Sequence, residues 1–534
     1  MLDCIITHGR IVDGSGGTPY LGDIGIHGGK IACIKPWGSG LAAAQTIDAA
    51  NQYVSPGFID MHRHEDAVVF SPGYGEVQLR QGITSAISGN CGLSIVPFPV
   101  KQRALIAAYL KPIIGILPED TEFETLGDYL GLLDTHPLPI NVGMLMGNGT
   151  IRMAVQGFEK GRLSKEGVQQ AWAYLEDALQ NGAFGVSLGL AYMPENCYDH
   201  AGFIQVLEPI RGSSVPLVTH IRGEGNLLVE SLEEIIALSE ALQVPLHISH
   251  YKCVGSKNWG HLLHKATGTL DRARDRGLRI TLDVYPWTAG ASQLAQVLPP
   301  EYLEGGLAKA AARLNDPALR RECARILSRP NEGFENQIDL IGWENIMVSA
   351  VHTEQNRPYV GKRITEIARE RGCDPVDAAF DLLIEETGDV AMVNFIACEA
   401  DIRTILQYPY SSVISDAVYP AGGLPHPRQY GTFPKLLSEY VRDQKILTLP
   451  EAIHKITQGP ASVFSISNKG SITEGYDADL VIFDLERIEN HASYVEPRRL
   501  GTGFSYVLVN GVVANDHDIY YGTTSGQVLR RKGV

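Results

Sequence analysis

Two histidines spaced two residues apart, His62 and His64, follow a short apolar segment in PGFIDMHRHEDA, residues 56–67. Side chains alternate along an extended strand, so residues i and i+2 point the same way. The two imidazoles can therefore face one point, which is the arrangement that a metal ion needs. Two histidines in a surface loop would show the same spacing, so the motif must be weighed with the rest of the chain.

Further residue types that bind metals occur where other predicted strands end. Each one has a structural explanation when taken alone, such as a buried thiol for the cysteine or a helix N-cap for the aspartate. Their coincidence at five strand ends favours a zinc site, because zinc accepts nitrogen, sulfur and oxygen ligands. The candidate metal-site residues are His62, His64, Cys91, His220, His250 and Asp416.

The elements that must position these residues are strands alternating with helices. About eight parallel βα units are typical of a (β/α)8 barrel, whose active site lies at the carboxyl ends of the strands. We expect the barrel at residues 55–465, with a mostly helical insertion at about 290–345 over its mouth. The predicted strands are 56–60, 82–88, 140–146, 185–188, 216–220, 246–250, 280–284, 346–350 and 412–414, and the predicted helices are 164–180, 227–242 and 259–276.

Both ends of the chain are rich in predicted strands. Residues 2–7, 23–27 and 30–34 are typical of short strands, with HGGK as a hairpin turn, and SITEGYDADLVIFDL and FSYVLVNGVVAND near the other end have the same character. This pattern predicts a small β-sandwich domain built from residues 1–54 and 466–534. Two separate edge hairpins would be the alternative.

The composition excludes several classes of protein. A net charge of −16 argues against nucleic-acid binding, which needs a basic surface. No apolar run reaches the roughly 20 residues of a membrane span. The N-terminal sequence lacks the pattern of a secretory signal, so we expect a cytoplasmic protein. The eight cysteines form no CxxC pair, which fits neither a disulfide framework nor a zinc finger.

Motifs spread along the whole chain resemble those of a known family. SPGFIDMHRH, with ITHGRIVDGSG before it and GSITEGYDADLVIFD near the C-terminus, resembles the amidohydrolase superfamily. Within it, GNCGLS, GAFGVSLGLAY, THIRGEG, HISHYK, DVYPWTAG, HPRQYGTFP and ITQGPASVF are similar to the N-acyl-D-amino-acid deacylases, or D-aminoacylases. The resemblance implies zinc-dependent hydrolysis of the amide bond of a small N-acyl-D-amino acid, which yields a carboxylate and a free D-amino acid.

The resemblance also implies roles for the candidate metal-site residues. One group would bind a tightly held zinc, and a second group would hold a weaker metal position or support the first. A carboxylate would serve as general base and later as general acid. In this chain the first group is Cys91, His220 and His250, the second is His62 and His64, and the carboxylate is Asp416.

Substrate-binding residues follow from the same resemblance. Lys252, Tyr285 and Arg428 would hold the α-carboxylate of the substrate, since two cations and a phenol suit that group. Tyr192 and Trp287 are expected as walls of the substrate pocket, together with the insertion. The side chain and acyl group of the substrate are not predicted.

Several positions depart from the family pattern or bear on specificity. Asn148 stands in GNGTIR where the family often has a histidine, and an asparagine cannot carry a proton at neutral pH. Arg63 lies between the two histidines, and strand alternation predicts that it points away from the metal. An acidic substrate would need a further cation, for which Arg222 and Arg152 are conceivable.

Three alternatives stay open at this point. A cyclic amidase like hydantoinase or dihydroorotase would need a lysine to bridge two metals, and GAFGVSLGLAY offers none. A deaminase would need an acid near the metal, for which Glu224, four residues after His220, is the only obvious candidate. A non-catalytic scaffold would be expected to lack metal ligands.

Overall fold

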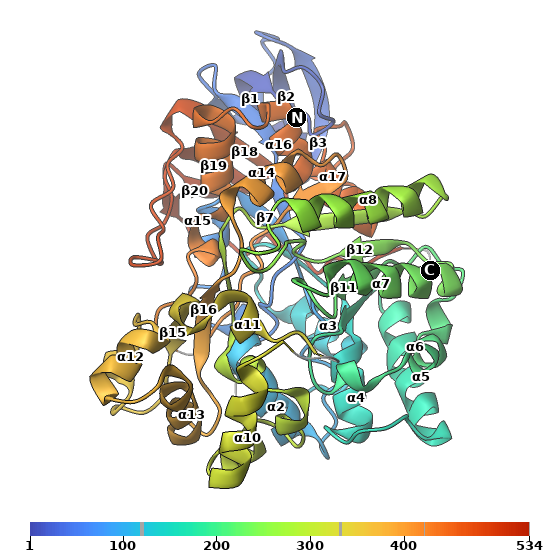
Figure 1. Cartoon of the computed structure of the whole chain (residues 1–534). Coiled ribbons are helices and arrows are strands. Elements are labelled where there is room, and N and C mark those ends of the chain that lie inside the picture. Colours follow the sequence, from blue (N-terminus) through green and yellow to red (C-terminus); the bar gives the residue numbers. More distant parts are fainter. Residues whose placement is uncertain (118–121, 331–333, 421, 533–534) are drawn as a thin grey trace.

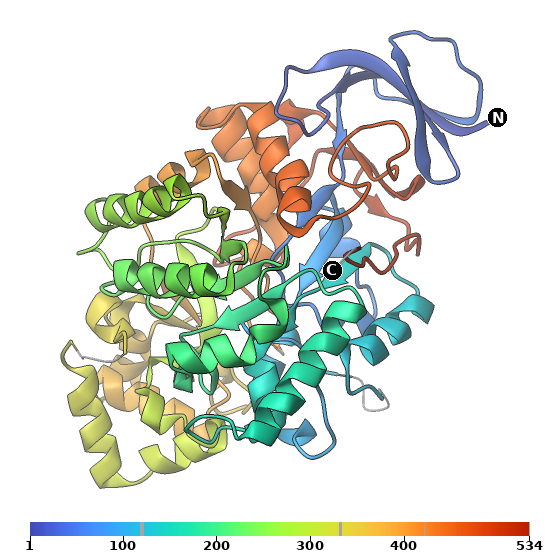
Figure 2. The same ribbon diagram turned by 90° about the vertical axis from the view of Figure 1, so that its right-hand side faces the viewer.

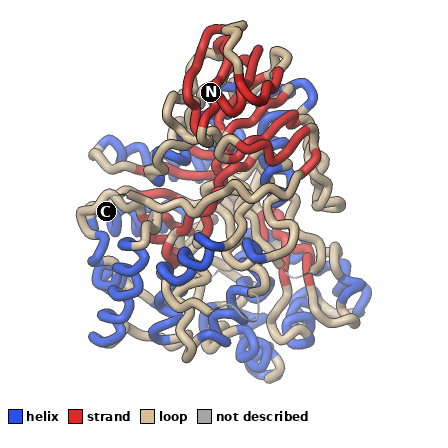
Figure 3. Tube along the Cα trace, turned by 180° about the vertical axis from the view of Figure 1, so that it is seen from behind, coloured by secondary structure: helices blue, strands red, loops and turns tan. Residues whose placement is uncertain are grey.

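The computed structural model describes residues 1–534 except 118–121, 331–333, 421 and 533–534. Strands lie at one end and through the middle of the molecule, and most helices lie toward the opposite end (Figure 3). Three assemblies of strands make up this arrangement. They are a nine-stranded sheet, a set of parallel strands and a small antiparallel sheet.

The nine-stranded sheet contains strands from both ends of the chain. Its order is β21-β20-β19-β18-β5-β1-β2-β3, with β4 beside β1. The N-terminal strands form one end of the molecule (Figure 2). Branched aliphatic side chains of alternate positions fill its core. The strands are β1 (Leu2–Ile11), β2 (Tyr20–His27), β3 (Lys30–Pro36), β4 (Ala43–Asp48), β5 (Tyr53–Pro56), β18 (Leu480–Phe483), β19 (Phe504–Val509), β20 (Val512–Asp516) and β21 (Ile519–Tyr520).

The parallel strands form two runs that adjoin at both ends. One run is β6-β7-β8 and the other is β17-β13-β12-β11-β10-β9. Only Leu145 separates β8 from β9, and a parallel bridge between Arg63 and Ala417 joins the segments after β6 and β17. The strands are β6 (Phe58–Asp60), β7 (Ile83–Ser88), β8 (Asn141–Met144), β9 (Met146–Gly147), β10 (Val186–Gly189), β11 (Leu217–His220), β12 (Leu246–Ile248), β13 (Ile280–Val284) and β17 (Ser411–Val413).

Helices lie between the parallel strands and cover them (Figure 1). The predicted helices at 164–180, 227–242 and 259–276 are confirmed as α5, α7 and α8. Among the described residues, no helix combines the length and apolar character needed to cross a membrane. The helices are α1 (Glu76–Leu79), α2 (Arg103–Ile114), α3 (Leu126–Thr135), α4 (Asn148–Gln156), α5 (Lys165–Gln180), α6 (His200–Val206), α7 (Leu228–Leu242), α8 (His261–Asp275), α14 (Glu399–Gln407), α15 (Arg428–Lys435), a π-helix (Leu436–Asp443), α16 (Leu449–Ile456) and α17 (Gln458–Phe464).

One predicted barrel strand belongs elsewhere. β15 (Ile346–Ala350) pairs antiparallel with β16 (Ala391–Phe395), which also pairs with β14 (Ala289–Gln293), so its assignment to the parallel strands is wrong. All five residues of β15 are buried, and a fully buried strand has the same sequence pattern in a parallel sheet and in an antiparallel sheet. The α-helices between β14 and β16 are α9 (Leu307–Leu314), α10 (Pro317–Leu327), α11 (Gln337–Ile341), α12 (Ile364–Arg371) and α13 (Pro375–Glu385).

Candidate metal centre and substrate cavity

All six candidate metal-site residues lie where parallel strands end. Because parallel strands present their carboxyl ends at one edge, residues far apart in sequence meet there. The structure brings the six side chains together, and each is buried. His62 and His64 follow β6, Cys91 follows β7, His220 ends β11, His250 follows β12 and Asp416 follows β17.

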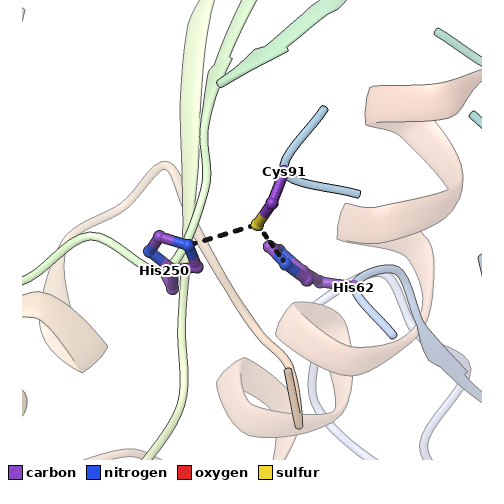
Figure 4. Close-up of side chains that lie close together, drawn as sticks. All are labelled: His62, Cys91 and His250. Atoms are coloured by element: carbon purple, nitrogen blue, oxygen red, sulfur yellow. Dashed lines mark hydrogen bonds between the residues drawn. The ribbon is translucent and has the colours of Figure 1, made fainter. Parts of the chain in front are cut away.

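The side chains form overlapping groups of potential metal ligands. Cys91 Sγ lies 3.3 Å from His62 Nε2 and 3.4 Å from His250 Nε2 (Figure 4). His220 Nδ1 lies 2.7 Å from His250 Nε2. Nitrogen and sulfur donors at such separations suit zinc by their chemistry. The three groups whose ligand atoms lie within 4.8 Å of one another are His62–Cys91–His250, His62–His64–Asp416 and His220–Glu224–His250.

Three of these residues have a left-handed backbone conformation. The φ angles are 56° at Cys91, 35° at His250 and 49° at Asp416. Residues other than glycine seldom adopt positive φ, and those that do cluster at functional sites. Each of the three follows a strand within three residues, so the turn directs its side chain back toward the shared edge.

Asp283 on β13 orients two of the histidines. Its Oδ2 lies 3.3 Å from His62 Nδ1 and 2.9 Å from His247 Nε2, while Oδ1 accepts a hydrogen bond from the backbone N–H of His250. Burial alone would raise the pKa of Asp283, but His62 and His247 hold it well below its usual range. A carboxylate behind an imidazole fixes the ring and leaves its other nitrogen free for a metal. His247 lies behind the site, where it contacts Asp283 and Thr281.

Charge at Cys91 and Asp416 is stabilised by neighbouring groups. Burial raises the pKa of the Cys91 thiol, yet His62 and His250 hold it well below its ordinary value. Asp416 Oδ1 lies 3.4 Å from both His62 Nε2 and His64 Nε2. Burial opposes ionisation of Asp416, but Arg428 and His62 hold its pKa far below the usual range. The site therefore favours a thiolate and a carboxylate, which are ligand forms.

The predicted substrate residues surround one cavity of about 430 Å³ beside the metal-site residues. Lys252 Nζ and the Arg428 guanidinium carbon lie 5.7 and 4.6 Å from the centre of the Tyr285 ring. Tyr192 also lines the cavity, with its hydroxyl 3.2 Å from His220 Nδ1. Trp287 does not line the cavity, because its ring packs against His426 and Tyr494, so its expected place in the pocket wall is wrong.

Glu224 has a role that its sequence context did not reveal. Its Oε1 accepts a hydrogen bond from Lys252 Nζ at 2.6 Å and lies 3.0 Å from His250 Nδ1. Burial favours the neutral acid, but Lys252 and His220 hold the pKa of Glu224 well below its usual value. Glu224 is thus held in an ion pair with Lys252 beside His250.

The insertion reaches the cavity through Glu335. Its carboxylate accepts hydrogen bonds from the backbone N–H groups of Glu224, Gly225 and Leu227, at 2.7–3.1 Å. Glu335, Phe334 and residues of the 290–303 segment line the cavity. The insertion is thus fastened to the loop that follows β11, and it forms part of the cavity wall.

Asn148 and Arg63 both face away from the ligand cluster. The Asn148 side-chain amide donates to Glu195 Oε1 at 2.6 Å, and Glu195 Oε2 accepts from the Gly189 N–H at 2.6 Å. Arg63 forms buried ion pairs with Asp60 at 2.9 Å and Glu65 at 2.7 Å, which confirms its predicted direction. The Asn148–Glu195 pair was not predicted, because nothing in the sequence links these two positions.

Comparisons with known proteins find relatives that match nearly the whole chain. The model of a family described as "Amidohydrolase family" matches residues 45–514. The N-acyl-D-glutamate deacylase of Alcaligenes xylosoxydans xylosoxydans is 32% identical, over 96% of this chain and 93% of the relative. The D-aminoacylase of the same organism is 29% identical, over 99% and 98%. The crystal structure of an N-acyl-D-glutamate deacylase from Bordetella bronchiseptica, complexed with zinc and a phosphonate inhibitor, matches with a TM-score of 0.82 and 29% identity over 99% of each chain.

Proposed function

Because this chain belongs to the amidohydrolase family, we propose that it hydrolyses the amide bond of N-acyl-D-amino acids, releasing a carboxylate and a free D-amino acid. The observation that carries the proposal is the meeting of two groups in one cavity. A cluster of sulfur, nitrogen and oxygen ligands lies beside Lys252, Tyr285 and Arg428. The first group suits a hydrolytic metal and the second suits a carboxylate.

The proposed architecture is a (β/α)8 barrel at residues 55–465 with a small β-sandwich from 1–54 and 466–534. Its support is the adjoining order of the parallel strands and the shared sheet of the two chain ends. A barrel accounts for the location of the ligand cluster, since active sites of this fold lie at the carboxyl ends of the strands.

The proposed metal is zinc. Cys91, His220 and His250 would hold it tightly, and His62 and His64 would hold a second, weaker position or support the first. The fit rests on the donor set, in which a thiol with a lowered pKa meets imidazoles. When bound, zinc supplies Lewis acidity, which makes water more acidic and polarises a carbonyl group.

The transfer of a proton from the attacking water to the leaving amine is assigned to Asp416. Its carboxylate takes a proton from the water that attacks the acyl carbon. As the C–N bond breaks, Asp416 returns this proton to the nitrogen of the leaving amine. Its buried position and its 3.4 Å separation from both His62 and His64 place it beside the ligand cluster, where attack would occur.

Lys252, Tyr285 and Arg428 are assigned to the α-carboxylate. These contacts anchor one substituent of the α-carbon, and the acyl group must point toward the ligand cluster. The side chain then takes a direction that differs between the two enantiomers, and the cavity wall accepts only one of them. Tyr192, whose hydroxyl lies 3.2 Å from His220 Nδ1, lines the cavity and is assigned to contact with the substrate.

The proposal is tested by hydrolysis of paired N-acetyl-D- and N-acetyl-L-amino acids, with methionine, leucine, glutamate and aspartate as side chains. Release of free amine is followed on zinc-loaded protein, with the metal-free protein as control. We expect turnover of D forms only. Turnover of L forms at equal rates, or of none of the eight compounds with zinc still bound, would overturn the proposal.

A further inference from the structure

We propose that the cavity selects N-acyl-D-amino acids whose side chain is uncharged and discriminates against D-glutamate and D-aspartate. This inference rests on the function proposed above and adds the class of side chain. It starts from the basic residues of the cavity. Four lysines and arginines line it, and each is already paired with a carboxylate: Lys160, Arg222, Lys252 and Arg428.

The two inner cations, Lys252 and Arg428, lie beside the candidate metal ligands. Lys252 pairs with Glu224 at 2.6 Å and Arg428 pairs with Asp416 at 2.8 Å. Both also lie against the ring of Tyr285, and both are assigned to the α-carboxylate that every N-acyl amino acid carries. Neither is therefore left for a second carboxylate on the side chain.

The two outer cations are each paired with a glutamate, the Lys160 pair being half-exposed and therefore the weaker of the two. The Arg222 guanidinium makes a two-pronged contact with Glu234, at 2.9 Å from Nε and 2.8 Å from Nη2, and Nη1 donates to two backbone carbonyls. Lys160 forms an ion pair with Glu304. A bidentate pair uses the directional donors of arginine, so Arg222 has little capacity to bind another anion.

No further basic side chain can complete the site. The residues outside the described part are PEDT at 118–121, NEG at 331–333, Ala421 and Gly533-Val534, and none is a lysine or arginine. The structure thus describes every lysine and arginine of the chain. Arg152, conceivable from the sequence, is not among the residues that line the cavity and instead donates to two backbone carbonyls.

The remaining cavity wall suits uncharged groups. Gln293 donates through Nε2 to the Tyr109 carbonyl at 3.0 Å, so this donor is not free for a substrate carboxylate. Glu335 also lines the cavity, and its carboxylate repels a second carboxylate. Burying an unpaired carboxylate against this wall would be costly. The apolar part of the wall includes Leu93, Tyr109, Ile113, Met193, Leu298 and Leu303.

Isosteric substrates test the inference directly. Zinc-loaded enzyme is assayed with N-acetyl-D-glutamine against N-acetyl-D-glutamate, and with N-acetyl-D-asparagine against N-acetyl-D-aspartate. We expect kcat/KM to be at least about tenfold higher for the amide of each pair, because only the acid brings an unpaired charge. Equal values, or preference for either acid, would overturn the inference while leaving the deacylase function intact. Turnover of no N-acyl-D-amino acid would overturn the function, and the inference with it.

A substitution that removes the partner of one cation tests whether the pairing of the cations causes the selectivity. Glu234→Gln removes the partner of Arg222, so the kcat/KM ratio of D-glutamate to D-glutamine should rise by about threefold or more. Glu233→Gln, an exposed neighbour on the same helix, is the matched control and should leave the ratio unchanged. An unchanged ratio in Glu234→Gln would overturn the claim that neutralised cations set the selectivity.

Discussion

Arg428 Nη1 lies 2.8 Å from Asp416 Oδ2, and both side chains are almost entirely buried. The other oxygen of the same carboxylate faces the imidazoles of His62 and His64. One ion pair therefore connects the group assigned to the substrate carboxylate with the group assigned to proton transfer. A substrate carboxylate that contacts Arg428 must share the guanidinium with Asp416, so substrate binding and the basicity of Asp416 are linked.

The first prediction concerns Arg428. Arg428→Lys keeps the charge but loses the planar donor pair, so KM for an N-acetyl-D-amino acid should rise about tenfold or more. The methyl ester of the same substrate, which lacks the α-carboxylate charge, should be affected much less. Arg325→Lys, an exposed pair on α10, is the matched control. An equal loss for acid and ester would show that Arg428 acts on Asp416 alone.

The second prediction concerns Asp416. Asp416→Asn preserves the shape but removes the proton acceptor, so kcat should fall by about 10²–10⁴ with a small change in KM. Steady-state kinetics and zinc content are measured on the same preparation, because loss of metal would also lower kcat. Asp275→Asn, at an exposed position of α8, should behave as the wild type. A kcat within a few-fold of wild type at full zinc content would remove Asp416 from its role.

The third prediction concerns Cys91. Cys91→Ala removes the sulfur between His62 and His250, so the affinity for zinc should fall by about 100-fold or more. Competition with a chelator of known affinity measures this change. Cys323→Ala removes another buried thiol, in α10, and should bind zinc as the wild type does. Equal zinc affinity in the two variants would exclude Cys91 as a ligand.

The position of the site could be predicted from sequence because the ligand types follow apolar strands directly. Cys91, His220 and Asp416 each stand within three residues of a strand end, and parallel strands share one edge. This pattern brings the residues together even where the predicted ends of the strands differ from the observed ends by a few residues. The same reasoning predicted the direction of Arg63, because neighbouring residues of an extended segment face opposite ways.

Contacts between distant segments could not be predicted from one sequence. β15 is apolar and buried, as a parallel strand would be, and only its pairing with β16 distinguishes it. Glu335 lies in the insertion, more than 100 residues from the backbone amides that it accepts from. The contacts of Asp283 with His62 and His247 depend on the packing of three strands.

The fourth prediction concerns the stability contributed by Glu195. Burial raises the pKa of Glu195 to about 7 from a reference value of 4.5. The folded protein therefore holds this proton at pH values where the unfolded chain has released it. The contribution of Glu195 to stability is complete below about pH 4.5, declines as pH rises toward 7 and is lost above it, at a total cost of up to about 3 kcal/mol.

Glu195→Gln should remove this dependence, since glutamine keeps the shape and cannot ionise. Its amide can also donate to the Asn148 carbonyl oxygen, which has no donor among the described residues. The free energy of unfolding of Glu195→Gln relative to wild type should therefore rise by about 2 kcal/mol between pH 5.5 and pH 8. Denaturant unfolding at the two pH values measures this difference, and exposed Glu233→Gln should show none. A difference that stays constant with pH, or falls, would mean that Glu195 is already ionised in the folded protein at pH 5.5.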